Sequence, residues 1–275
     1  MPFIKSSPNN TTPVNIYYED MGIGKPVVFI HGWPLSGSMW EYQVTQLPQQ
    51  GLRCITYDRR GFGKSDRPFE PYDYDTLAGD LKSLLDELNL NDVTLVGFSM
   101  GGGEIAKYFS LYGGARVSKV VLVSAVVPYM LQTEDNPDGV PPEVFDRMTK
   151  AMVDDRPGFM TDFNMDFFGV SITHKPVSDA FLANSLTKTM DASPIATLKC
   201  AEAFATTDFR QDIIKINVPT LVIHGDKDKT VPIKATGEVS SKWIPGARFV
   251  VYEDAPHGLW YTHKEQLNQD LIDFI

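Results

Sequence analysis

The chain has 275 residues, of which 43% are hydrophobic, so it is long enough for one large core or for one core with an inserted lid. Its formal net charge of −10 makes nucleic acids and anionic membranes unfavourable partners, and neither is expected. The first residues contain no apolar stretch of signal-peptide length, and no apolar run reaches the roughly 20 residues needed to span a bilayer. We therefore expect a cytoplasmic protein.

Short apolar runs bounded by Gly, Pro or Asp recur along the chain, at residues 25–32, 52–61, 92–99, 117–128, 218–228 and 247–258. They are rich in β-branched residues and apolar at consecutive positions, which suits strands buried on both faces of a parallel sheet. Patterns typical of amphipathic helices occur at residues 74–90, 101–114 and 262–275. This alternation predicts an α/β fold with a mostly parallel central sheet flanked by helices.

One long segment, residues 129–209, breaks this rhythm. It lacks clear strand signals and is rich in Met, Phe, Asp and Pro. A structureless loop of that length would be unusual in a compact domain. We therefore expect a helical cap at 129–209, inserted into an α/β core that residues 1–128 and 210–275 form.

A serine lies between glycines where one predicted strand meets a predicted helix. Residues 97–101 read GFSMG and match the G-x-S-x-G pattern. Glycines two residues on either side of Ser99 remove Cβ atoms that would collide in a sharp turn, which leaves the serine exposed. The pentapeptide alone is also compatible with a glycine-rich turn that carries an incidental serine. No phosphate-binding G-x-x-x-x-G-K-[ST] motif occurs in the sequence.

A nucleophilic serine needs a base, and a carboxylate must orient that base. His257 lies in a loop directly after the last predicted strand, where its side chain can reach the carboxyl edge of the sheet. The preceding strand ends near Asp226 and Asp228. We expect Asp226 to form a local turn and choose Asp228 as the acid. The order Ser99, Asp228, His257 is that of α/β-hydrolases.

The other histidines are expected to have structural or solvated roles: His31, His174, His224 and His263. A tetrahedral intermediate also needs hydrogen-bond donors for its oxyanion. The backbone N–H of Met100 follows the nucleophile at the start of a helix, with the helix dipole behind it. Trp33, in the loop after the strand predicted at 25–32, offers the second N–H.

With these residues placed, the chain resembles the α/β-hydrolase superfamily and, within it, the cofactor-free bacterial haloperoxidases, perhydrolases and aryl esterases. The matching segments are HGWP, YDRRGFGKSDRP, GFSMGGGE, VSAVVPYMLQTEDNPDGVP, FRQDIIKINVPTLVIHGDKDKTVP and APHGL. The resemblance implies Ser99 as nucleophile, Asp228 as acid and His257 as base. It implies the Trp33 and Met100 amides as oxyanion hole, no haem, metal or other cofactor, and a homo-oligomer.

The resemblance further implies a serine esterase that acts on small or aryl esters, with perhydrolysis as a side activity. In that group a carboxylic acid acylates the serine, hydrogen peroxide replaces water as acceptor, and the released peracid oxidises halide. A lactonase, for instance on acyl-homoserine lactones, and a lactam-cleaving amidase stay open, because both would use the same triad. A ligand receptor that retains the triad also stays open. Dehalogenases and epoxide hydrolases are disfavoured, since those relatives carry Asp at the position of Ser99.

Several apolar residues near the predicted site are candidates for a substrate pocket: Phe98, Val127, Met130, Phe163, Phe167, Phe168 and Val231. Core packing is the default role for each of them. If several line the pocket, the acyl or aryl part of the substrate is small and apolar.

Overall fold

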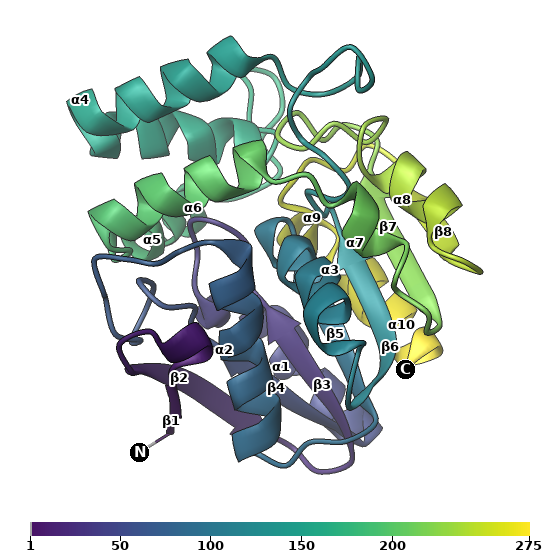
Figure 1. Cartoon of the computed structure of the whole chain (residues 1–275). Coiled ribbons are helices and arrows are strands. Elements are labelled where there is room, and N and C mark those ends of the chain that lie inside the picture. The colour runs from purple at the N-terminus through teal and green to yellow at the C-terminus, as the bar shows by residue number, and fades with distance from the viewer. Residues whose placement is uncertain (1) are drawn as a thin grey trace.

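A computed structural model describes residues 2–275 and contains one eight-stranded sheet (Figure 1). The strands are β1 Phe3–Ser6, β2 Val14–Met21, β3 Lys25–Ile30, β4 Leu52–Tyr57, β5 Val93–Phe98, β6 Val117–Val123, β7 Thr220–Gly225 and β8 Arg248–Tyr252. Their spatial order is β1-β2-β4-β3-β5-β6-β7-β8, and all neighbours from β4 to β8 run parallel. The predicted α/β fold with a mostly parallel sheet is thereby confirmed.

The sequence patterns did not predict the two strands at one end of the sheet, β1 and β2, which pair antiparallel. Their residues alternate between buried and exposed positions over part of their length. A strand with one face toward solvent lacks the continuous apolar run that marks a strand buried on both faces. The six predicted runs all contain strands, and these six form the parallel part of the sheet.

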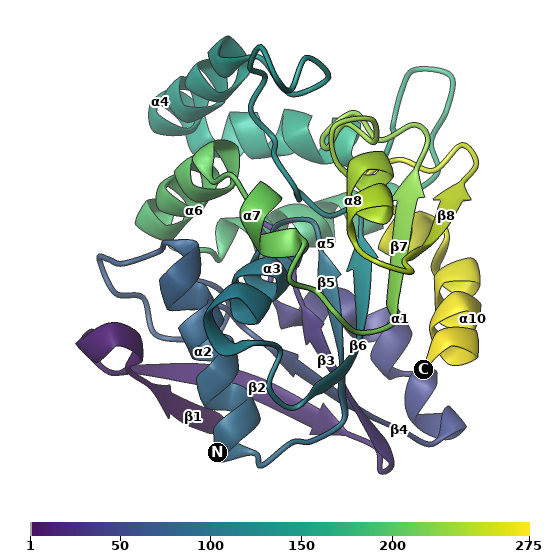
Figure 2. The same cartoon turned by 45° about the vertical axis from the view of Figure 1, so that its right-hand side comes forward.

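Helices cover both faces of the sheet, with α2 and α3 on one face and α1 and α10 on the other (Figure 2). The helices are α1 Glu41–Val44, α2 Tyr74–Glu87, α3 Met100–Tyr112, α4 Pro142–Phe167, α5 Asp179–Met190, α6 Pro194–Thr206, α7 Arg210–Ile213, α8 Gly237–Trp243, α9 Leu259–Thr262 and α10 Lys264–Phe274. No helix in the described part of the chain is both long and apolar enough to cross a bilayer.

Two apolar clusters hold the layers together, one on each face of the sheet. Successive residues of β3 alternate between them: Val28 and Ile30 belong to one cluster, Val27 and Phe29 to the other. All four side chains are fully buried. This is the consequence of a two-residue side-chain period in a strand that has helices on both sides.

The helices α4, α5 and α6 lie together above one end of the sheet, away from the N-terminus (Figure 1). Two of them begin at serine caps: Ser178 accepts a hydrogen bond from the Phe181 N–H, and Ser193 precedes a proline at the first position of α6. The long α4 changes direction at Asp155, whose backbone is not helical (φ −153°, ψ 83°). These helices form the wall that faces the carboxyl ends of the strands.

Candidate active site

Ser99 occupies a tight turn between the end of β5 and the start of α3. Its backbone has a φ of 52°, in the left-handed region that residues with a Cβ rarely adopt. A Cβ on Gly97 would lie 2.8 Å from the Gly101 oxygen, and one on Gly101 would lie 2.7 Å from the Ile30 oxygen. Glycine is therefore required at both positions. The Ser99 N–H donates a hydrogen bond of 2.9 Å to the Val123 oxygen, which fixes the turn against β6. The turn presents the hydroxyl at the edge of the sheet.

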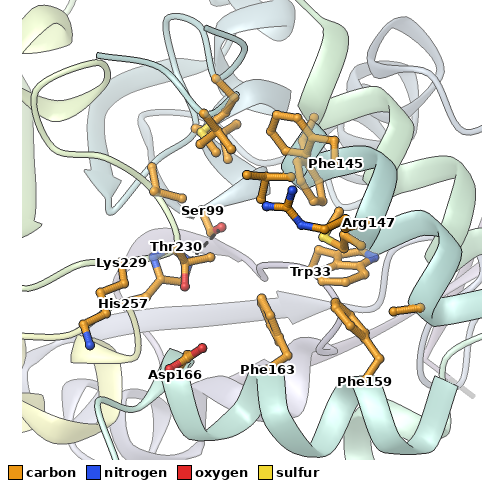
Figure 3. A pocket seen from close by; sticks show the side chains of 18 residues that line it. Trp33, Ser99, Phe145, Arg147, Phe159, Phe163, Asp166, Lys229, Thr230 and His257 are labelled. Carbon is orange, nitrogen blue, oxygen red and sulfur yellow. Dashed lines mark hydrogen bonds between the residues drawn. The ribbon is translucent and has the colours of Figure 1, made fainter. Parts of the chain in front are cut away.

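The structure brings the predicted serine, histidine and aspartate together. His257 Nε2 lies 3.0 Å from Ser99 Oγ, and His257 Nδ1 lies 2.6 Å from Asp228 Oδ2 (Figure 3 shows Ser99 and His257). Because an ionised carboxylate only accepts, Nδ1 carries the proton and Nε2 is free to accept the Ser99 hydroxyl hydrogen. Ser99 and His257 are 6% and 1% exposed, so this chain of hydrogen bonds is shielded from water.

Asp228 is held in place through both carboxylate oxygens. Oδ1 accepts the backbone N–H groups of Thr230 at 2.9 Å and Val231 at 2.8 Å. Burial by itself would raise the pKa of Asp228, but the electrostatic attraction and hydrogen bond of His257, together with the hydrogen bond of His224, outweigh it and lower the pKa well below its usual value. Asp228 therefore stays ionised near neutral pH. Asp226, in contrast, is exposed beside Lys227.

His224 forms a second contact with the same carboxylate, which the sequence did not predict. Its side chain is fully buried, with Nε2 3.0 Å from the Val231 oxygen and 3.2 Å from Asp228 Oδ2. Both neighbours are acceptors, so Nε2 carries a proton and is shared between them. Asp228 lies four positions after His224, and β7 ends between them at Gly225. A turn after the strand brings the two side chains together, and this short spacing is the signal that could have suggested the contact.

Two backbone N–H groups beside Ser99 lack an acceptor within residues 2–275. They belong to Trp33, after β3, and Met100, the first residue of α3. The first N–H groups of a helix have no partner inside the helix, and they form the positive end of its dipole. Met100 directly follows Ser99, and Trp33 and Ser99 line the same cavity.

The orientation of the Trp33 N–H is fixed by its neighbours. The Gly32 oxygen accepts from the Leu35 N–H at 3.1 Å and contacts His31 Nδ1 at 2.8 Å. His31 Nε2 accepts the Arg59 N–H at 2.9 Å, so Nδ1 carries the proton. Burial holds the pKa of His31 well below its usual value, so the ring stays neutral. In a trans peptide the N–H points away from the C=O, and the Trp33 N–H consequently faces away from this buried side.

A buried ion pair ties this loop to the helix that follows the nucleophile. Arg59 donates from Nε to Glu104 on α3 at 2.6 Å and from a terminal nitrogen to the His31 oxygen at 2.7 Å. The Tyr57 hydroxyl donates to the second Glu104 oxygen at 2.6 Å. The charged side chains are at most 1% exposed. The network connects the two elements that supply the free N–H donors.

A cavity of about 400 Å³ opens above Ser99 (Figure 3). Of the predicted pocket residues, Met130, Phe163 and Val231 line it. Further apolar residues also line it: Val126, Val140, Val144, Phe145, Met148, Ala151, Phe159 and Phe204. Most of these residues lie on α4 and α6. Residues three or four positions apart lie on the same face of a helix, and this spacing is the sequence signal that could have identified them.

The other four predicted pocket residues lie outside the lining. The Phe98 and Phe167 rings flank His257, with ring centroids 4.9 and 4.8 Å from the imidazole. Phe168 and Val127 are fully buried, in the two opposite apolar clusters. Phe98 ends β5, where successive side chains point to opposite faces, so it enters the core beneath the site and not the cavity. Phe98 and Phe167 pack against the imidazole and do not line the cavity.

The polar lining of the cavity consists of few groups. Besides Ser99, His257 and Thr230, three charged residues contribute: Arg147, Asp166 and Lys229. Within residues 2–275 no cluster of three or more His, Cys, Asp or Glu side chains is arranged to hold a metal ion. The arrangement places a serine hydroxyl, an imidazole and two backbone N–H groups beneath an apolar chamber.

Comparisons with known proteins agree with this geometry. The family model for the alpha/beta hydrolase fold matches residues 25–264. The non-heme chloroperoxidase CPO-A1 of Kitasatospora aureofaciens is 44% identical over 95% of this chain and 96% of its own. The bifunctional esterase/perhydrolase DCH of Acinetobacter calcoaceticus is 37% identical over 95% of this chain and 96% of its own. The crystal structure of a bromoperoxidase from Bacillus anthracis superposes with a TM-score of 0.94 at 47% identity, over 99% of both chains.

Proposed function

Because the chain belongs to the alpha/beta hydrolase family, we propose that it is a serine hydrolase that cleaves small or aryl carboxylic esters through an acyl-enzyme. Ser99 is the nucleophile, His257 the base and Asp228 the acid that orients it. The N–H groups of Trp33 and Met100 form the oxyanion hole. The observation that carries the proposal is the unbroken hydrogen-bond chain from Ser99 Oγ to Asp228 at the floor of an apolar cavity.

Acylation follows from the protonation states of the site. His257 Nε2 takes the hydroxyl proton as Ser99 Oγ attacks the ester carbonyl carbon. The carbonyl oxygen becomes an oxyanion, which the two free N–H groups stabilise; each such donor lowers the barrier by about 3 kcal/mol. His257 then gives its proton to the alcohol oxygen as the carbon–oxygen bond breaks. The alcohol leaves, and the acyl group stays on Ser99.

Deacylation repeats these steps with a second nucleophile. Water, deprotonated by His257, attacks the acyl carbon and releases the carboxylic acid. Hydrogen peroxide can replace water, and the product is then a peracid and free Ser99. The named perhydrolase and haloperoxidase activities of the relatives support this second activity. The peracid, once released, would oxidise halide without a metal in the protein.

We also propose that residues 129–209 act as a cap that restricts the cavity to small substrates. Helices α4 and α6 supply most of the apolar lining, and both lie in this segment. A chamber of about 400 Å³ is at the small end of ligand sites. The proposed ligand is therefore a small molecule with a short acyl or aryl group.

The test is pre-steady-state hydrolysis of p-nitrophenyl acetate and butyrate by the wild type and Ser99→Ala, with an acyl-homoserine lactone as third substrate. We expect a burst followed by steady turnover of the aryl esters, both absent in Ser99→Ala. A far higher kcat/KM for the lactone would make the protein a lactonase with the same residues. Binding of all three without turnover would overturn the hydrolase assignment in favour of a receptor.

A further inference from the structure

The three charged residues of the cavity lining have no part in the acyl-transfer steps. Arg147 lies on the first half of α4, Asp166 near the end of the same helix, and Lys229 directly after Asp228. In Figure 3, Lys229 and Asp166 lie near His257. Arg147 lies across the cavity, on the other side of Ser99. The lining thus presents opposite charges on one side and a single cation on the other.

The two sides of the cavity receive different parts of an ester. His257 must reach the alcohol oxygen to protonate it, so the alcohol part occupies the His257 side. The acyl part then extends to the opposite side, which is lined by Trp33, Phe145 and Arg147 (Figure 3). The aromatic side chains suit an apolar chain. A guanidinium beside them suits an anion at the far end of that chain.

Arg147 has no ion-pair partner within 4.0 Å in the described part of the chain. Glu143 lies four residues earlier on α4, in the order that favours a surface ion pair, yet the pair is not formed. Lys150, one turn further along the same helix, does pair with Asp154, at 2.5 Å. Within residues 2–275 the Arg147 guanidinium has no hydrogen-bond acceptor, and it is turned toward the cavity that it lines (Figure 3).

We propose that Arg147 selects esters whose acyl chain ends in a carboxylate, so that half-esters of small dicarboxylic acids are preferred substrates. This inference rests on the proposed esterase function and specifies its substrate class. A chain with net charge −10 repels anions over most of its surface. Arg147 is solvent-exposed, and its guanidinium in the cavity lining is the feature that admits an anion, through two parallel hydrogen bonds to the carboxylate.

The experiment compares monomethyl adipate with its neutral counterpart, methyl adipamate, in which a carboxamide replaces the carboxylate. Acid release is followed by pH-stat for the wild type, Arg147→Gln and Lys150→Gln. We expect the wild type to prefer the carboxylate substrate. Arg147→Gln should lower the carboxylate-to-carboxamide ratio of kcat/KM about fivefold, mainly by raising KM for the carboxylate. A fivefold change corresponds to about 1 kcal/mol. Lys150→Gln removes a positive charge from the same helix outside the cavity lining, and it leaves both rates unchanged.

The outcomes separate this inference from the function on which it rests. A wild-type ratio of one or less overturns it, and so does an Arg147→Gln ratio equal to that of the wild type. An equal fall in Lys150→Gln would assign the effect to net charge and also overturn it. If the wild type hydrolyses methyl adipamate through Ser99 in any of these cases, the esterase assignment stands. If Ser99-dependent turnover of both esters is absent, both proposals fail.

Discussion

The two walls of the cavity are built in different ways. The strand-end wall holds Ser99, His257 and Asp228, which are buried and linked by hydrogen bonds of 2.6 to 3.0 Å. The helix wall, formed by α4 and α6, presents mainly apolar side chains to the cavity, and α4 bends at Asp155. A wall fixed by many directional contacts suits bond making. A wall of apolar contacts can change its shape by substitution, which suits substrate choice.

The largest effect is expected on the strand-end wall, from Asp228→Asn. An asparagine can donate to His257 Nδ1 and would favour the tautomer whose Nε2 proton blocks the Ser99 hydroxyl. We expect kcat for p-nitrophenyl butyrate to fall about 10⁴-fold with KM little changed. A decrease below tenfold would show that Asp228 does not set the tautomer.

The buried network behind this wall should dominate stability. Glu104→Gln leaves the Arg59 guanidinium buried without its counter-charge, and we expect a loss of about 3 kcal/mol in the free energy of unfolding. The matched control is Asp20→Asn, which breaks the partly exposed pair with Arg53 and should cost below about 1 kcal/mol. Urea denaturation measures both values. Equal losses would contradict the role given to the buried network.

The second histidine beside Asp228 should have a moderate effect on the rate. His224→Leu removes the shared Nε2 donor and lets the carboxylate turn, and we expect kcat to fall about tenfold, or 1.4 kcal/mol, with KM retained. His224→Gln can place an amide donor in the same position and should recover most of the loss. A positioning role predicts this rescue, whereas equal losses in both variants would indicate packing alone.

The smallest change is expected on the helix wall, from Phe163→Ala. Phe163 lines the cavity and its ring packs edge-on against Trp33, with centroids 5.4 Å apart. The vacated space should shift the preference among p-nitrophenyl esters toward longer acyl chains, with kcat/KM rising about fourfold for each added methylene. That factor corresponds to the ~0.8 kcal/mol gained when one methylene is buried. Phe168→Ala, a neighbour outside the lining, is the control. A chain-length profile altered equally in both variants would refute the assignment of this wall to selectivity.

The difference between the walls also explains how much the sequence could predict. The parallel strands, the turn at Ser99 and the positions of Asp228 and His257 were predictable, because each depends on residues close together in the chain. The pocket was predictable only in part. Which face of α4 meets the cavity depends on how that helix docks, so Phe167 and Phe163 look alike in the sequence and differ in the structure.

Charged residues on the helix wall show the same limit. Arg147 lies in a segment that also contains Glu143, Asp146 and Lys150, and in sequence it reads as part of a solvated helix surface. Only its placement beside the cavity without an ion-pair partner in residues 2–275 sets it apart. His224 is similar, because its contact with Asp228 depends on how the chain turns after β7.

The proposed mechanism depends on the activation of Ser99 by His257 as a covalent nucleophile. The most direct test of this activation is intact-mass and peptide analysis of the protein after incubation with a small alkyl fluorophosphonate. We expect one adduct per chain, located on the peptide that contains Ser99, and far slower labelling in His257→Gln. An absent adduct, or labelling and inactivation through another residue, would contradict it.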